Sequence, residues 1–215
     1  MTGRASTSLL CATALLVAGC TQTVGGTAVR PVPGIDEDSR SPVDVDGVLL
    51  DRSQMQAITG AGVDLTPIPG TDSKVPVDLS MPDFFLKNIP QQCHWAYDET
   101  QIFGPDVEEF RKESYQNPPG GGIISQGAAG YRDTATARGV FDDVVAQIQE
   151  CGTTRSSGAT VGEITATPDS IHTRTGNCGR DYRVKSAVLV EVTFCAFPDS
   201  VPDIVVTNIV ANIPD

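Results

Sequence analysis

The chain has 215 residues, of which 40% are hydrophobic, and this supplies enough apolar side chain for one packed domain with a tail. That content excludes wholesale disorder. The formal net charge of −12 argues against nucleic-acid binding, because an acidic surface repels phosphate backbones, and against docking to anionic lipids through a basic patch.

Residues 1–19 have the pattern of a bacterial lipoprotein signal peptide. Arg4 provides a positive start, and residues 9–18 form an apolar run that is too short to span a bilayer. The sequence Val-Ala-Gly-Cys at 17–20 resembles the lipobox, where a signal peptidase cuts before the cysteine and its thiol receives a diacylglycerol. We therefore expect attachment to the outside of the cell membrane through Cys20 and acyl chains such as palmitate. The alternative is an ordinary secretory signal with a chance cysteine.

Residues 20–44 comprise this cysteine and a predicted flexible tether, which contains prolines and glycines but no apolar period. The folded domain is expected over residues 45–215. Its first predicted element is a short helix, because Asp51 and Gln54 have the spacing of a capping box and Gly60 stands where the helix should end.

The central element of the domain is a helix predicted over residues 134–151. Its apolar residues recur at steps of three and four, as expected for one buried stripe, and Gly152 follows where a left-handed residue would end the helix. Before it, residues 62–81 are predicted to be an irregular loop and residues 123–131 a strand, while for residues 105–119 both helix and strand stay open.

The part of the chain after the central helix predicts strands and one more helix. Residues 160–170 alternate weakly, and residues 171–174 either extend this segment or pair with it. Residues 182–195 have the clearest strand signal, because they are rich in β-branched side chains. Asp199 or Ser200 can cap a final helix with an apolar stripe over residues 201–210. This order predicts an α+β fold, a single domain in which an antiparallel sheet packs against a few helices.

Four cysteines remain once Cys20 and the segment before it are set aside: Cys93, Cys151, Cys178 and Cys195. An even number of thiols in an exported chain predicts disulfides, and three pairings are possible. We prefer Cys178–Cys195 together with Cys93–Cys151, because the former pair brackets a predicted hairpin. A zinc site would require close pairs such as Cys-x-x-Cys, which the sequence lacks, so no metal ligand is expected.

The sequence contains no recognisable catalytic constellation. His94 and His172 are its two histidines, and it has neither a Gly-x-Ser-x-Gly elbow nor a phosphate-binding loop. We therefore expect no enzyme, no catalytic residue and no cofactor. The candidate ligand-binding residues are aromatic side chains on expected loops: Trp95, Tyr97, Phe110, Tyr115 and Tyr131. Packing in the core is the competing interpretation for each of them.

The order of these features resembles a known family. Leu49, Leu50 and Met55 precede a cysteine beside an aromatic residue, a phenylalanine-bearing helix ends on a second cysteine, and a valine-rich hairpin between two further cysteines leads to the final helix. The most specific part is the 16-residue gap between Cys178 and Cys195. The arrangement resembles the PknH-like extracellular sensor domain, found on a mycobacterial receptor serine/threonine kinase and on stand-alone mycobacterial lipoproteins of the LppH type.

The resemblance covers about residues 45–215. It implies one α+β domain with the disulfides Cys93–Cys151 and Cys178–Cys195. It also implies a cleft with apolar and polar lining for an unidentified ligand, and it transfers no catalytic residue.

Three functional hypotheses follow. The leading one is a lipid-anchored, extracytoplasmic sensor-type domain that binds a small envelope molecule or a peptide in a cleft beside the central helix; a pocket of about 300–1,000 Å³ would favour it. The second is a structural or interaction lipoprotein that contacts another envelope protein, which a flat exposed apolar patch would favour. The third, a hydrolase of unrecognised design, would require a buried carboxylate or histidine with a shifted pKa in a cleft.

Overall fold

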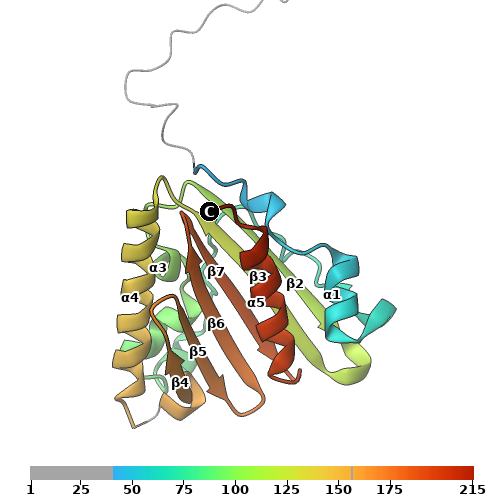
Figure 1. Ribbon diagram of the computed structural model, residues 1–215. Coiled ribbons are helices and arrows are strands. Elements are labelled where there is room, and N and C mark those ends of the chain that lie inside the picture. Colours follow the sequence, from blue (N-terminus) through green and yellow to red (C-terminus); the bar gives the residue numbers. More distant parts are fainter. Residues whose placement is uncertain (1–40, 156) are drawn as a thin grey trace, which may run out of the picture. The chain divides into compact units, whose positions relative to one another are not determined.

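A computed structural model of the chain describes residues 41–155 and 157–215 (Figure 1). The predicted signal peptide, Cys20 and most of the predicted tether therefore lie outside the described residues. Within the described residues, no helix is both long enough and apolar enough to cross a membrane.

Seven strands form one sheet, in the spatial order β1-β2-β3-β7-β6-β5-β4, and all neighbouring strands pair in the antiparallel sense. The strands are β1 (Thr66–Pro67), β2 (Glu109–Asn117), β3 (Gly122–Gly130), β4 (Glu163–Ala166), β5 (Ser170–Thr175), β6 (Cys178–Lys185) and β7 (Val188–Cys195). Strands β4 to β7 form a meander that begins at one edge and returns to β3. The α+β fold with an antiparallel sheet is thus confirmed.

Helices cover both faces of the sheet (Figure 1). The α-helices are α1 (Arg52–Thr59), α2 (Asp83–Leu86), α3 (Glu99–Phe103), α4 (Thr134–Gly152) and α5 (Ser200–Asn212). The 3-10 helices are η2 (Val45–Gly47), η3 (Gly62–Asp64), η4 (Gln91–Tyr97), η5 (Pro118–Gly120) and η6 (Ser157–Ala159).

The sheet has a separate hydrophobic core on each face. Because side chains alternate along a strand, Val190 of β7 packs with α1 and α5, while its neighbour Leu189 packs with η4, α3 and α4. Burial on both faces explains why β7 is an almost continuous apolar run, which gave residues 182–195 their strong strand signal. That stretch contains β7 and the second half of β6, joined by a turn at Ser186, whose φ is 52°.

The first helix has the predicted caps. The carboxylate of Asp51 accepts from the backbone N–H of Gln54 at 2.9 Å, and the Gln54 side chain accepts from the backbone N–H of Asp51, also at 2.9 Å, so the capping box is confirmed. Gly60 follows in the left-handed conformation with φ 68°. Packing begins slightly before residue 45, because Val43 is already buried in the core with α1 and α5.

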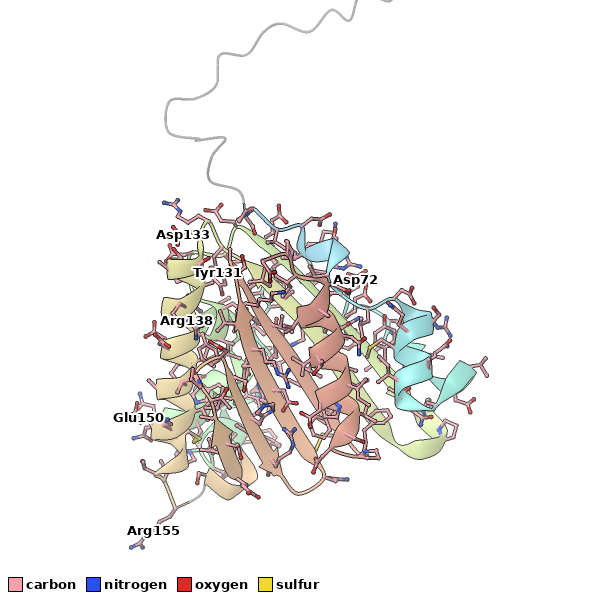
Figure 2. All side chains as sticks on the ribbon, viewed as in Figure 1. Asp72, Tyr131, Asp133, Arg138, Glu150 and Arg155 are labelled. Atoms are coloured by element: carbon pink, nitrogen blue, oxygen red, sulfur yellow. A yellow bond between two sulfur atoms is a disulfide. The ribbon has the colours of Figure 1, made fainter. Side chains whose placement is uncertain are left out.

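The central helix α4 begins as predicted, with the Asp133 carboxylate accepting from the backbone N–H of Thr136 at 2.8 Å. Its C-terminal end differs, because Gly152 is the last helical residue and has no positive φ. A Cβ at this position would lie 2.7 Å from Cδ1 of Ile164, the movable end of that side chain, so Gly152 packs closely against β4. The opposite side of α4 faces solvent, and Glu150 projects outward from it (Figure 2).

Two disulfides join distant parts of the fold, in the pairing preferred from the sequence. Cys93–Cys151 ties η4 to the end of α4 across a sequence separation of 58. Cys178–Cys195 joins directly opposite residues of β6 and β7. The ambiguous residues 105–119 contain β2, which pairs with β3 along its whole length.

Candidate functional site

Two adjoining cavities lie on the sheet face that carries η4, α3 and α4. The first has a volume of about 490 Å³ and is bordered by residues 70–79, η4 and α3. The second, of about 290 Å³, lies towards β5 and η6. Tyr97, Arg180 and Thr193 line both cavities, so together they form one cleft, which we call the sheet cleft. Its larger part has the volume of a small-ligand site.

The floor of the sheet cleft is a row of polar side chains that runs across the strands. The register pairs Ser114 with Ser125, Ser125 with Thr193, Thr193 with Arg180, and Arg180 with Thr173. Directly opposite residues point to the same face, so these five side chains from β2, β3, β7, β6 and β5 lie side by side. Neighbouring strands are about 4.8 Å apart, which sets the spacing of the row.

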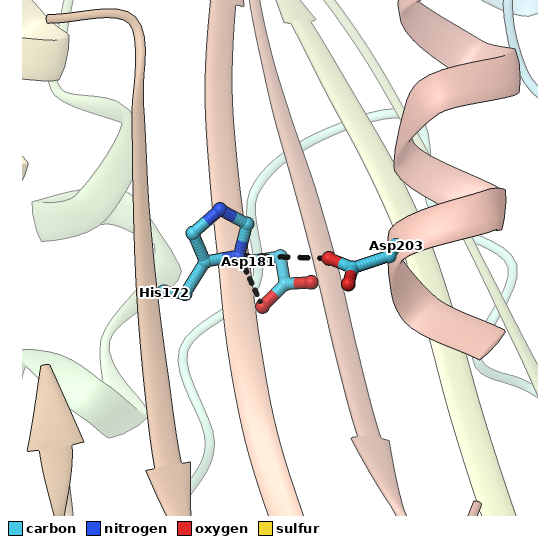
Figure 3. A group of neighbouring side chains, drawn as sticks. All are labelled: His172, Asp181 and Asp203. Atoms are coloured by element: carbon cyan, nitrogen blue, oxygen red, sulfur yellow. Dashed lines mark ion pairs between the residues drawn. The ribbon is translucent and has the colours of Figure 1, made fainter. Parts of the chain in front are cut away.

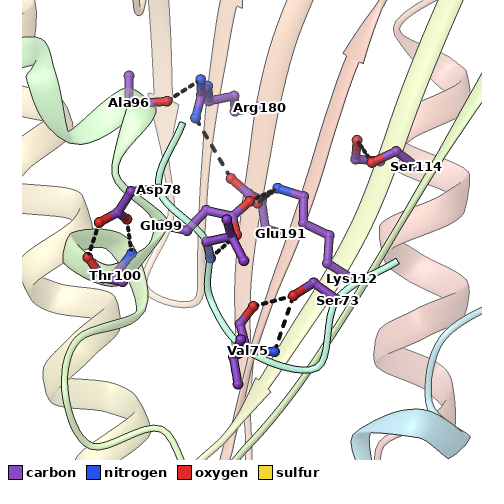
Figure 4. A network of polar contacts seen from close by, with 12 residues as sticks. Ser73, Val75, Asp78, Ala96, Glu99, Thr100, Lys112, Ser114, Arg180 and Glu191 are labelled. Carbon is purple, nitrogen blue, oxygen red and sulfur yellow. Dashed lines mark hydrogen bonds and ion pairs between the residues drawn. The ribbon is translucent and has the colours of Figure 1, made fainter. Parts of the chain in front are cut away.

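A buried charge cluster borders this row on one side (Figure 4). Glu191 of β7 is 1% exposed, and its carboxylate lies 3.1 Å from Nζ of Lys112 on β2 and accepts from the Tyr182 hydroxyl at 2.8 Å. Lys112 also pairs with Glu99 of α3. Arg180 lies 3.8 Å from Glu191.

The charged forms of the cluster stabilise each other. Burial raises the pKa of the Glu191 carboxyl, but the charges of Lys112 and Arg180 and the hydrogen bond from Tyr182 lower it by more. Burial lowers the pKa of the Lys112 ammonium, but Glu191 and Glu99 raise it by more. Glu191 is therefore a fixed carboxylate with its oxygens engaged, which is unlike the raised pKa expected of a general acid.

The segment at residues 70–79 forms one wall of the sheet cleft. Ser73 pairs with Lys112 through two backbone hydrogen bonds of 3.0 and 2.9 Å. Asp78 accepts from both the backbone N–H and the hydroxyl of Thr100, at the start of α3. These contacts hold the wall on both sides of the charge cluster (Figure 4).

The family model of the PknH-like extracellular domain matches residues 41–213, a range that includes the whole sheet and the sheet cleft. The chain belongs to the PknH-like extracellular domain family. Membership confirms the resemblance seen in the sequence and places this sensor-type domain on the extracytoplasmic side of the membrane.

A solved structure supports the family's fold for this chain. The crystal structure of the extracellular domain of PknH from Mycobacterium tuberculosis is 16% identical in sequence, with a TM-score of 0.58. The match covers 80% of this chain and 97% of that chain. At this identity the likeness shows a shared fold. No curated protein matches the chain significantly.

The structure of this PknH-like domain separates the five aromatic candidates. Tyr97 lies in the sheet cleft, where its two cavities meet. Trp95 is 2% exposed and packs in the core beside Cys93–Cys151, with the guanidinium of Arg180 over its ring at 5.8 Å. The remaining three are buried away from the sheet cleft: Phe110, Tyr115 and Tyr131.

The hydroxyl groups of two of these buried residues have partners of their own. Tyr131 donates to the backbone carbonyl of Phe103 at 2.8 Å, and Tyr115 donates to Glu113 at 2.6 Å. Burial raises the pKa of both phenols, that of Tyr131 more strongly. They are packing residues of the domain, although Tyr115 also borders a separate cavity.

The polar residues of the sheet cleft were not among the sequence candidates. Lys112 and Ser114 lie in the segment without a clear period, because a strand that buries polar side chains on one face loses the usual alternation. Glu191 offered one usable signal, as the single charged residue within the apolar run of β7. A lone carboxylate inside a buried strand requires a partner, and here it has Lys112.

A further cavity, separate from the sheet cleft, lies at the β1 edge of the sheet, on the face that carries α1. It has a volume of about 610 Å³ between α1, β1 and β2, and Arg111 crosses it to contact the carboxylates of Asp72 at 2.7 Å and Glu113 at 2.8 Å. This guanidinium spans the cavity and ties the loop after β1 to β2. We therefore regard the sheet cleft as the stronger candidate site.

One group among residues 41–155 and 157–215 has the spacing of metal ligands: His172, Asp181 and Asp203 (Figure 3). Nδ1 of His172 lies 3.0 Å from Asp181, in an ion-pair contact without good hydrogen-bond alignment. Arg174, however, binds both oxygens of the fully buried Asp181 carboxylate. The guanidinium thus occupies the position that a cation would need, so the group serves as a clamp between β5, β6 and α5.

Asp199, predicted as a candidate cap of the final helix, instead contacts Arg174 of this clamp. Its side chain makes no capping hydrogen bond, and its carboxylate lies 3.3 Å from Nε of Arg174. The start of α5 is therefore held to β5 by charge.

The clamp predicts a pH dependence of stability. Burial raises the pKa of the Asp181 carboxyl, but His172 and Arg174 lower it by more, so its pKa lies below the ordinary value. The contribution to the free energy of unfolding is therefore present above about pH 4 and is lost as the pH falls through the lowered pKa. We expect the Asp181→Asn variant to be less stable than the wild type at pH 7, with a flatter decline between pH 5 and pH 2 in urea unfolding.

Asp203→Asn is the matched control, because Asp203 is 53% exposed and stands 4.0 Å from both His172 and Arg174. A surface pair of this kind contributes about 0–1 kcal/mol. Equal pH profiles for the wild type and Asp181→Asn would contradict the assignment of acid sensitivity to Asp181.

Proposed function

We propose that the protein is anchored to the cell membrane through acyl chains on Cys20 and that its extracytoplasmic domain binds a small molecule or a peptide in the sheet cleft. The observation that carries the binding proposal is the sheet cleft itself. It places polar side chains from five strands at the bottom of a cavity, where a folding role alone would favour apolar residues. The lipobox pattern at residues 17–20 supports the anchor.

Binding accounts for the sheet cleft better than catalysis does. Its buried carboxylate, Glu191, is held by Lys112 and Tyr182 and has a lowered pKa, so it offers neither a labile proton nor a free base. Neither His94 nor His172 is among the residues that line the sheet cleft. We accordingly propose a binding protein without catalytic residues.

One observation favours the alternative of contact with another envelope protein through the surface. Residues 75–85, of which Val77 and Leu79 line the sheet cleft, expose a series of apolar side chains: Val75, Val77, Leu79, Phe84 and Phe85. Phe84 is 66% exposed. An apolar strip of this kind is typical of interaction surfaces.

The test is recovery of compounds retained by the full-length protein, purified from membranes and analysed by mass spectrometry. A Thr193→Trp variant fills the sheet cleft at the junction of its cavities. The matched control is Thr165→Trp, because Thr165 is exposed on β4 and its register partners face α5. We expect a compound that the wild type and control retain and that Thr193→Trp loses.

Retention that Thr193→Trp leaves unchanged would contradict binding in the sheet cleft. Recovery of a protein in place of a compound, abolished in a Phe84→Ser/Phe85→Ser variant, would favour the surface-contact alternative.

A further inference from the structure

The charges in the sheet cleft are already neutralised by one another. Each charged side chain that lines it has an opposite partner within the protein: Lys112 with Glu99 and Glu191, Arg180 with Glu191, and Asp72 with Arg111. Arg180 also donates to the backbone carbonyl of Ala96 at 2.6 Å. A charged ligand would therefore lose its hydration without gaining a free counter-charge, which is costly in a partly buried site.

The groups that remain for a ligand are mainly hydroxyls. Ser114, Ser125 and Thr193 lie along the floor, and Ser125 donates to Ser114 at 2.8 Å, which leaves the Ser114 proton for another acceptor. Thr173 continues the row but is 1% exposed, and its hydroxyl donates to the backbone carbonyl of Arg180 at 3.5 Å. A hydroxyl both donates and accepts hydrogen bonds, so it matches a partner that does the same. The row crosses the strands at intervals of about 4.8 Å and suits an elongated ligand with repeated polar groups.

The walls add a limited apolar contact. The ring of Tyr97 stands where the two cavities meet, and Ile102 and Val77 border the larger one. An aromatic ring beside polar groups is suited to a ligand that has one apolar face and hydroxyls at its rim. A fatty chain would instead leave the hydroxyl floor without partners.

From these three features we infer that the sheet cleft recognises an uncharged polyhydroxyl ligand, a neutral oligosaccharide segment, which lies across β2, β3, β7 and β6. This inference rests on the proposed binding function and specifies the class of ligand. The hydroxyl row supplies the hydrogen bonds, and Tyr97 packs on the apolar face of a sugar ring. The internally paired charges select against anionic and cationic compounds.

The test is saturation-transfer NMR and titration calorimetry on the full-length protein with a fixed set of probes. The neutral probes are maltotetraose, cellotetraose, mannotetraose and a neutral polysaccharide digest. The others are inorganic phosphate, tetra-galacturonate, spermidine, tetra-alanine and dodecanol. We expect binding of at least one neutral oligosaccharide and none of phosphate or spermidine.

The decisive variant is Thr193→Val, which removes a hydroxyl and keeps the shape of the side chain. Losing one hydrogen bond is expected to weaken binding of the oligosaccharide roughly 3- to 10-fold. The double variant Ser125→Ala/Thr193→Val should weaken binding by a larger factor. Thr165→Val is the matched control, with the same change on the opposite face, and it should leave the affinity unchanged. Thermal unfolding of each variant separates a local effect from loss of folding.

The outcomes distinguish the two proposals. If dodecanol, tetra-alanine or a charged probe binds and Thr193→Trp abolishes that binding, the sheet cleft is a ligand site and the oligosaccharide assignment is overturned. If no probe binds and purified protein retains no compound, both proposals are overturned. Oligosaccharide binding that Thr193→Val and Thr165→Val affect equally also overturns the assignment.

Discussion

Replacing Cys93 and Cys151 together by alanine is expected to lower the free energy of unfolding by about 4 kcal/mol. The disulfide closes a loop with a sequence separation of 58, and on the chain-entropy model the stabilisation grows with loop length. Both residues are fully buried, so the variant also loses close packing between η4 and α4. Urea unfolding at 25 °C and pH 7 measures the effect.

The second disulfide provides the matched comparison. Cys178 and Cys195 are separated by 17 residues and already lie opposite each other in a hydrogen-bonded pair of strands. The Cys178→Ala/Cys195→Ala variant is therefore expected to lose about 3 kcal/mol, less than the first. A larger loss at this pair than at Cys93–Cys151 would show that loop length does not govern the stabilisation.

The parts of the fold that could be predicted are those in which local chemistry and tertiary packing agree. A pattern within a few neighbouring residues was enough to predict three of them: the apolar stripe of α4, the capping box at Asp51 and the apolar run of β7. The end of α4 could not be predicted, because Gly152 remains in the helix, where it packs closely against Ile164 of β4, and does not adopt the left-handed conformation that would end the helix. Asp199 was likewise drawn to Arg174, which lies on another element.

The candidate site was predicted less well than the fold, for a related reason. Its chemistry comes from single residues on separate strands, such as Ser114, Ser125 and Thr193, that meet through the register of the sheet. No local spacing in the sequence brings them together. Of the aromatic candidates, Tyr97 lines the sheet cleft, whereas Phe110 and Tyr131 pack in the hydrophobic core.

Glu191→Gln is expected to destabilise the domain by about 3–5 kcal/mol, because it removes the central carboxylate of a buried cluster and leaves Lys112 and Arg180 undercompensated. Glu163→Gln is the matched control, an exposed acid on β4 that should change stability by less than about 0.5 kcal/mol. In a double-mutant cycle with Lys112→Met, the combined loss should be smaller than the sum of the single losses. Strict additivity would contradict direct coupling between the two side chains.

The same substitution should also change the charge preference of the sheet cleft. Without the Glu191 carboxylate, Arg180 keeps the Ala96 carbonyl and the Trp95 ring but no carboxylate partner, and Lys112 keeps Glu99. The cleft therefore gains one positive charge beside its hydroxyl floor. We expect Glu191→Gln to bind inorganic phosphate in calorimetric titrations under conditions where the wild type gives no heat of binding. Glu99→Gln removes a more accessible carboxylate and gives the same change in charge. It is the substitute variant if Glu191→Gln does not fold. If the wild type binds phosphate as tightly as both variants do, the paired charges do not neutralise the sheet cleft. The inferred selection for an uncharged ligand would then lose its basis.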